Sequence, residues 1–132
     1  MPEKKTLERA RRDKRQGKAP TTQAGEFVRE EIEHVRQGKH GARSTKQAIA
    51  IGLSKARRAG VRLKPPARGR TSRRTRRSAQ RAYAAGQSPR RKTSPRRSRA
   101  IVRALKREPR RTASSKALSR QARRSARRRK RA

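Results

Sequence analysis

The most regular pattern of apolar and polar positions in the chain lies between residues 44 and 60. Ile49, Leu53 and Ala56 recur at intervals of four and three residues, which places them on one face of a helix. A strip of small side chains adjoins this face and consists of Ala48, Gly52 and Ala59. This strip predicts a partner helix packed at short distance.

Local signals at both ends of this stretch agree with a helix. Ser44 and Gln47 have the spacing of a capping box, in which each side chain accepts a hydrogen bond from a backbone N–H of the first turn. Gly60 stands where a left-handed residue ends a helix, and Val61 can fold back on Ala56 in a Schellman motif. The pattern therefore predicts a helix with a defined start and stop.

A second apolar repeat predicts a helix over residues 22–37, with Thr22 as N-cap and Gly38 after its last turn. The linker 39–43 is short enough to fold this helix back onto the first as a hairpin of about residues 22–59. The predicted hairpin core is Phe27, Val28, Ile32, Val35, Ile49, Leu53 and Ala56. We expect these two apolar faces to meet.

The remaining chain divides around this hairpin. Residues 1–21 predict a short helix and a linker, residues 22–64 the hairpin, and residues 65–132 a basic tail that starts at a Pro-Pro pair. The tail has helical patterns near 72–85, 95–107 and 115–130. We expect these segments to be helical when a ligand neutralises them and frayed when free. The predicted fold class is all-α, a small helical hairpin plus a conditionally ordered basic tail.

Composition limits the size of any core and indicates the kind of partner. Only 27% of the 132 residues are hydrophobic and 2% aromatic, so the chain can bury little apolar surface. The formal net charge is +37, and residues 67–132 hold 27 of the 45 basic residues with one acidic residue. Such a charge repels itself unless a polyanion is bound, and nucleic acid is the obvious polyanion. Arg outnumbers Lys 23 to 4 in the tail, which favours bidentate contacts with phosphate.

The tail also contains a repeated tetrapeptide, Ser-Pro-Arg-Arg, at residues 88–91 and 94–97. It resembles the basic turn units in the tails of linker and sperm histones, whose two cations contact the DNA minor groove; a plain linker is the alternative interpretation. The predicted phosphate contacts are Arg73, Arg74, Arg77, Arg90, Arg91, Arg96, Arg97, Arg120, Arg123, Arg124, Arg127 and Arg128. The leading hypothesis is non-catalytic, sequence-independent DNA binding by a cytoplasmic, histone-like nucleoid protein. The alternative is a structural RNA-binding protein of the ribosomal type.

Other kinds of chemistry have weaker support in the sequence. The chain has no Cys and only two His, so we expect His34 and His40 to be solvent-exposed and to bind no metal. No serine stands in a pattern of nucleophilic catalysis, and we expect no cofactor. The longest apolar run is six residues, far short of the roughly 20 that a spanning helix needs, so we expect no membrane association. The hairpin could also serve for self-association.

Three stretches together resemble a family of small, basic bacterial proteins of unknown function. They are TTQAGEFVREEIEHVRQGKHGARSTKQAIAIGLSKARRAGV, RTRRSAQRAYAAGQ and SRAIVRALKREPRRTASSKALSRQARRSARRR, which cover nearly the whole chain. The resemblance implies a small helical fold and no known activity, cofactor or catalytic residue. The tail is also similar in composition to linker-histone and protamine tails.

Overall fold

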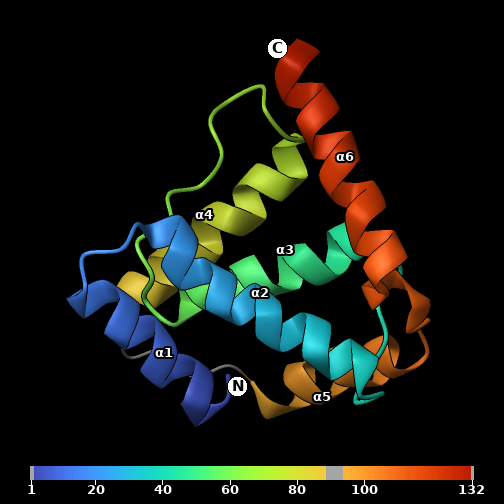
Figure 1. The fold of residues 1–132 in the computed structure, drawn as a ribbon. Helices are drawn as coiled ribbons and strands as arrows, with labels where there is room; N and C mark the ends of the chain where they lie inside the picture. The colour runs from blue at the N-terminus through green and yellow to red at the C-terminus, as the bar shows by residue number, and fades with distance from the viewer. Residues whose placement is uncertain (1, 89–93, 132) are drawn as a thin grey trace. The chain divides into compact units, whose positions relative to one another are not determined.

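The computed structural model describes residues 2–88 and 94–131, and this part of the chain is helical, without a strand (Figure 1). The helices are α1 (Lys4–Arg15), α2 (Pro20–Arg36), α3 (Thr45–Arg58), α4 (Arg73–Gln87), α5 (Pro95–Lys106) and α6 (Ser115–Arg131). A short 3-10 turn, η1 (Arg111–Ala113), precedes α6. The prediction of an all-α protein is confirmed.

Contacts divide the chain into two compact units. The first consists of Met1–Glu30 with Ala50–Lys92, and the second of Glu31–Ile49 with Thr93–Ala132. This grouping differs from the predicted division into a hairpin and a tail, because Arg-rich segments pack within both units. The apolar period along a helix shows which face is buried, but not which segment covers each turn of it.

The core of the first unit is small and centres on Phe27, which is 1% exposed. Ala10, Ala24, Ala56 and Val61 are buried with it, and Leu7, Leu53 and Leu63 pack against them. The predicted hairpin core is shared between the two units. Phe27 and Ala56 are buried in the first unit, with Val28 and Leu53 partly buried there. Ile32 and Val35 are buried in the second unit, where Ile49 is partly buried.

Helices α2 and α3 approach closely at Gly52, as the small-residue strip predicted. A Cβ on Gly52 would lie 2.6 Å from the Cα of Val28, so only glycine allows this distance between the two backbones. Ala48, on the same strip, is also buried, whereas Ala59 is exposed. The close approach thus involves the middle of the strip and not its C-terminal end.

The ends of α3 follow the local signals. Gln47 N–H donates to Ser44 Oγ at 3.1 Å, while Gln47 Oε1 accepts from the N–H of Arg43 at 2.6 Å instead of that of Ser44. At the other end Gly60 has φ +100°, and its N–H donates to Arg57 O at 3.1 Å. The N–H of Val61 donates to Ala56 O at 3.1 Å, which completes the Schellman motif.

The start of α2 differs from the prediction. The helix begins at Pro20, and the N–H groups of Thr22 and Gln23 donate to Ala19 O at 3.0 and 3.1 Å. Thr22 is therefore inside the first turn and is not the N-cap. The fixed φ of proline suits the first helical position, and this preference outweighs the capping tendency of Thr22.

Helix α4 belongs to the packed first unit. Ala79 and Ala82 are buried, and Ser72 Oγ accepts the N–H of Thr75 at 3.2 Å at the start of the helix. A Cβ on Gly86 would lie 1.7 Å from Arg57 O, so the last turn of α4 lies directly against the end of α3. Helix α4 continues one residue further to Gln87, and Gly86 serves this close contact.

In the second unit, the segment between α5 and α6 is hydrogen-bonded to the α2–α3 loop. The N–H of Gly41 donates to Leu105 O at 2.8 Å, and the N–H of Ala42 donates to Pro109 O at 2.9 Å. Thr112 Oγ1 donates to Ala42 O at 3.2 Å. These bonds give the second unit a framework of backbone contacts in place of a large apolar core.

Candidate nucleic-acid interface

Every predicted phosphate contact that the structure describes is exposed. Ten of the twelve fall within the described residues; Arg90 and Arg91, with most of the first Ser-Pro-Arg-Arg unit, lie outside them. The ten are Arg73, Arg74, Arg77, Arg96, Arg97, Arg120, Arg123, Arg124, Arg127 and Arg128. Three of them belong to the first unit and seven to the second. Exposure leaves their guanidinium groups available to a polyanion.

Helix α6 presents the longest regular array of these side chains. Its exposed arginines recur at helical spacing from Arg120 to Arg131, a rise of about 16 Å along the helix axis. Leu118, Gln121 and Ser125 are partly buried on a different side of the helix. A duplex carries about ten phosphate charges over the same length of its own axis. The array therefore matches a length of backbone that offers several phosphates at once.

Helix α4 has exposed arginines beside one arginine that is hydrogen-bonded to the protein's own backbone. Arg73, Arg74 and Arg77 are exposed, whereas Arg76 is partly buried and its Nε donates to Pro66 O at 3.3 Å. A shallow hollow on the exposed side is lined by Arg77, Gln80, Arg81 and Ala84. This helix thus uses one arginine to hold the preceding loop and leaves the others to solvent.

Three further arginines serve the fold and were not recognised from the sequence. Arg57 Nε and Nη2 donate to the carbonyl oxygens of Leu63 and Lys64 at 3.0 and 3.3 Å, and burial lowers the pKa of Arg57. Arg110 donates to the last carbonyls of α2, and Arg36 Nε donates to Ala113 O at 2.8 Å. The only available signal was the position of Arg36 and Arg57 in the last turn of a helix.

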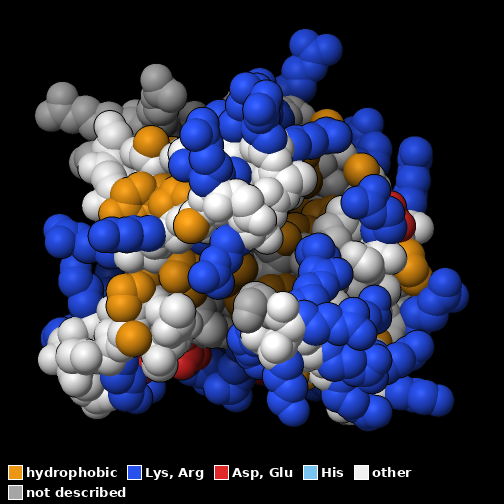
Figure 2. Space-filling model, turned by 90° about the horizontal axis from the view of Figure 1, so that it is seen from above, with side chains coloured by type: hydrophobic (Ala, Val, Ile, Leu, Met, Phe, Trp, Pro, Cys, Tyr) orange, Lys and Arg blue, Asp and Glu red, His pale blue; other side chains and the backbone are white. Residues whose placement is uncertain are grey.

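Five of the eight acidic side chains are buried or partly buried. Asp13, Glu30 and Glu31 are buried, and Glu26 and Glu108 are partly buried. Lys and Arg side chains therefore dominate the visible surface, with little acidic surface between them (Figure 2). A polyanion would meet little competition from the chain's own carboxylates.

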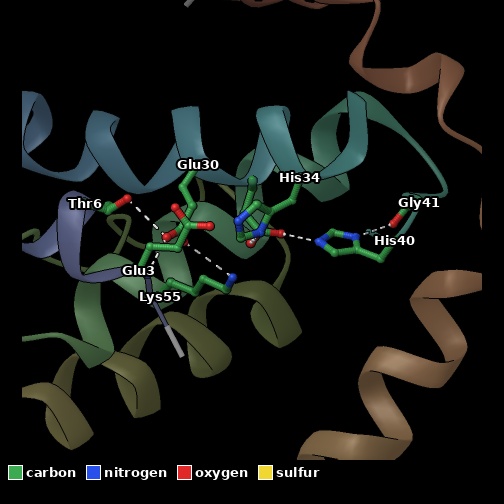
Figure 3. Close-up of polar contacts among 8 residues, drawn as sticks. Glu3, Thr6, Glu30, His34, His40, Gly41 and Lys55 are labelled. Carbon is green, nitrogen blue, oxygen red and sulfur yellow. Dashed lines mark hydrogen bonds and ion pairs between the residues drawn. The ribbon is translucent and has the colours of Figure 1, made fainter. Parts of the chain in front are cut away.

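Glu30 is held by several contacts within the first unit (Figure 3). It accepts hydrogen bonds from the N–H of Glu3 at 2.5 Å and from Thr6 Oγ1 at 3.1 Å. Lys55 Nζ lies 3.6 Å from its other oxygen. The carboxylate of Glu30 thereby connects the start of α1 with α2 and α3, which is a structural role.

The prediction that His34 and His40 are solvent-exposed is wrong. Their side chains, which Figure 3 labels, are only 13% and 10% exposed. Both lie against the fully buried Glu31 in the second unit. Nε2 of His40 is 3.1 Å from Glu31 Oε2, and Nδ1 of His34 is 3.7 Å from Glu31 Oε1. The turn at Gly38 reverses the chain after α2 and brings His40 back to that helix, which sequence spacing alone does not reveal.

Comparison with known proteins gives a family for the N-terminal half of the chain. Residues 4–68 match the model of a family of unknown function, DUF6496. The chain is similar to this family over these residues. The match contains α1, α2 and α3 and stops before α4, so the two resembling stretches of the tail lie outside it.

Further comparisons add no relative and no membrane span. Neither a curated protein nor a solved structure matches the chain. Among the helices of the described residues, none combines the length and the apolar character that crossing a membrane requires.

Proposed function

We propose that this protein binds duplex DNA through the phosphate backbone, without catalysis and without sequence preference, as a histone-like nucleoid protein. The observation that carries the proposal is the separation of charge: all ten described arginines of the predicted set are exposed, while the larger share of the acidic side chains is buried or partly buried. With a net charge of +37, the chain presents a cationic surface on helical supports. Such a surface binds by releasing the counterions condensed on DNA.

The aromatic side chains favour a duplex over single strands. Proteins that read single-stranded nucleic acid stack its bases on exposed aromatic rings. The chain has one Phe, one Tyr and no Trp; Phe27 is buried and Tyr83 is partly buried. A phosphate-directed mode of binding needs no stacking ring, so the composition fits the backbone of a double helix.

The amide side chains that pair with adenine are few beside the arginines. Asn is absent from the sequence, and the described arginines of the predicted set are exposed side chains distributed over both compact units. Specific recognition depends on directional pairs in the major groove, such as Asn or Gln with adenine and Arg with guanine. The proposed mode therefore discriminates little between duplex sequences.

A salt titration of the full chain tests the proposal. If about ten cations contact phosphates at once, log K falls against log salt with a slope near −9, and a fourfold rise in salt lowers affinity by about five decades. Two unrelated duplexes should bind within about tenfold of each other, or about 1.4 kcal/mol. A shallow slope, or a larger preference for one duplex, contradicts backbone binding.

The same titration with a structured RNA tests the alternative function. Nucleoid binding predicts release of the protein from a cell lysate by DNase and retention after RNase treatment. Release by RNase, together with tighter binding to the RNA, would assign the chain to the structural RNA-binding class. The full chain is the appropriate reagent because both compact units contain residues from both halves of the sequence.

A further inference from the structure

The two histidines of the chain converge on one carboxylate in the second unit. Glu31 and His34 lie three residues apart on α2, a spacing that places side chains on the same helix face. His40 reaches them from the loop after the helix, where the backbone bond from Gly41 N–H to Leu105 O holds the chain. One donor atom from each of the three residues lies within 4.8 Å of the others.

The hydrogen bond of His40 fixes which of its nitrogens faces Glu31. Nδ1 of His40 lies 2.9 Å from Gly41 O, and a carbonyl oxygen can only accept, so Nδ1 carries the hydrogen (Figure 3). Nε2 then points an electron pair at Glu31 Oε2 across 3.1 Å. Two such acceptors face each other stably only with a positive centre between them, either a proton or a metal ion.

The separations between donor atoms suit a metal ion. Two ligands at about 2.0–2.1 Å from a tetrahedral Zn²⁺ lie about 3.3 Å apart. The separations to the oxygens of Glu31 are 3.1 Å from His40 and 3.7 Å from His34, on either side of this value. The second separation is too long for a hydrogen bond. The bond from His40 to Gly41 O also has the form of the outer contact that orients metal-binding imidazoles.

We propose that Glu31, His34 and His40 form a binding site for one divalent transition-metal ion of the Zn²⁺ class. Two imidazoles and one carboxylate suit Zn²⁺, Co²⁺ or Ni²⁺, whereas Mg²⁺ and Ca²⁺ prefer oxygen ligands. Glu31 is fully buried, but both rings keep an exposed margin, so an ion can enter and a water can complete its coordination. The site shares no residue with the predicted phosphate contacts and does not depend on nucleic-acid binding.

Titration of the full chain with Co²⁺ tests the site directly. The chain has no Cys, so visible bands of the bound ion report on nitrogen and oxygen ligands alone. We expect one Co²⁺ per chain with the intense bands of a four- or five-coordinate ion, displaced by Zn²⁺. Because the protein has only two His, all imidazole ¹⁵N signals come from this site, and both rings should shift when Zn²⁺ binds.

Variants at the ligands and a matched control complete the test. His34→Ala and His40→Ala should each weaken Co²⁺ binding by more than about 100-fold, beyond the loss typical of outer-shell groups. Glu33→Gln, which neutralises an exposed carboxylate on the same helix, should leave it unchanged. The absence of visible bands, binding that survives both His variants, or equal loss in Glu33→Gln overturns the proposal. The ¹⁵N shifts in the unaltered chain decide the question even where a variant does not fold.

Discussion

Arg36 and Arg110 donate hydrogen bonds in opposite directions between the end of α2 and the segment before α6. Arg110 donates to the carbonyl oxygens of Val35, at 3.3 Å, and of Arg36, while the side chain of Arg36 donates to Ala113 O at 2.8 Å. The last carbonyls of a helix have no partner within it and carry partial negative charge, so guanidinium groups suit them. Arginine side chains thus connect two segments of the second unit, while other arginines are the proposed contacts with DNA phosphates.

Replacement of Arg110 by alanine should destabilise the second unit. The substitution removes the side-chain donor from two carbonyls at the end of α2, of which Val35 O keeps the N–H of Gly38. Because the side chain of Arg110 is largely exposed, we expect a loss of about 1 kcal/mol. Urea denaturation of the full chain measures it. Arg111→Ala removes the same charge from an exposed neighbour and should change stability by less than about 0.5 kcal/mol. Equal effects of the two variants would show that only charge matters here.

Two glycine substitutions should change stability in opposite directions. A Cβ on Gly41 would lie 1.7 Å from Glu108 O, so Gly41→Ala must break the contact between the α2–α3 loop and the segment after α5. We expect a loss of more than about 2 kcal/mol, in the range of severe core overpacking. Gly25 lies inside α2 with nothing within 4 Å of an added Cβ, so Gly25→Ala should stabilise by about 0.5–1 kcal/mol.

Thermal denaturation of the two variants checks this pair of predictions. A Gly41→Ala protein as stable as the unaltered chain would show that the loop does not dock on the backbone of Glu108. Loss of stability in both variants would mean that the helix interior at Gly25 is packed, contrary to the open space around it.

Gly52 and Gly60 are required for different reasons, and alanine should distinguish them. At Gly60 the φ of +100° is the difficulty, and the nearest atom to an added Cβ is 3.5 Å away, so Gly60→Ala should lose about 1 kcal/mol. At Gly52 an added Cβ meets the backbone of Val28 at 2.6 Å, so Gly52→Ala should force α2 and α3 apart and lose more. Circular dichroism in a urea series ranks them, and the opposite order would contradict the close helix contact.

The exposed arginines of α6 should carry a measurable share of DNA binding. Changing Arg120, Arg123, Arg124 and Arg127 together to Gln should reduce the slope of log K against log salt by about 3 to 4, one contact for each lost cation. A control with the same loss of charge changes Lys4, Lys5, Arg11 and Arg12, which are exposed on α1. This control should leave most of the slope intact. Equal reductions would mean that binding depends on net charge and not on α6.

The sequence predicted those parts of the fold that depend on neighbouring residues. The Schellman motif at Gly60 and the hydrogen bond from Gln47 to Ser44 follow from signals within a few residues, and both formed. The strip around Gly52 also predicted a close partner helix, because a glycine in the middle of a helix allows another backbone to approach closely. The signals that start and stop a helix depend on residues close together in the chain, so a single sequence is enough to recognise them.

Features that depend on distant segments were missed. Nothing near Gly41 or Gly86 indicated that another backbone lies within reach of their Cα atoms. The partial burial of His40 depends on a turn that returns it to Glu31, and the difference between Arg76 and Arg77 depends on the position of Pro66. In a chain this rich in arginine, the sequence does not distinguish an arginine that binds a backbone carbonyl from one that is exposed; the structure does.

The burial of the acidic side chains has a consequence for the kinetics of the proposed binding. An acidic segment held over a cationic surface would be an internal competitor that must dissociate before nucleic acid can bind. Here Glu108 is the one acidic residue beyond position 66, and it is partly buried. With no such segment to displace, association with DNA should proceed in a single step, at a rate set by electrostatic encounter and proportional to DNA concentration.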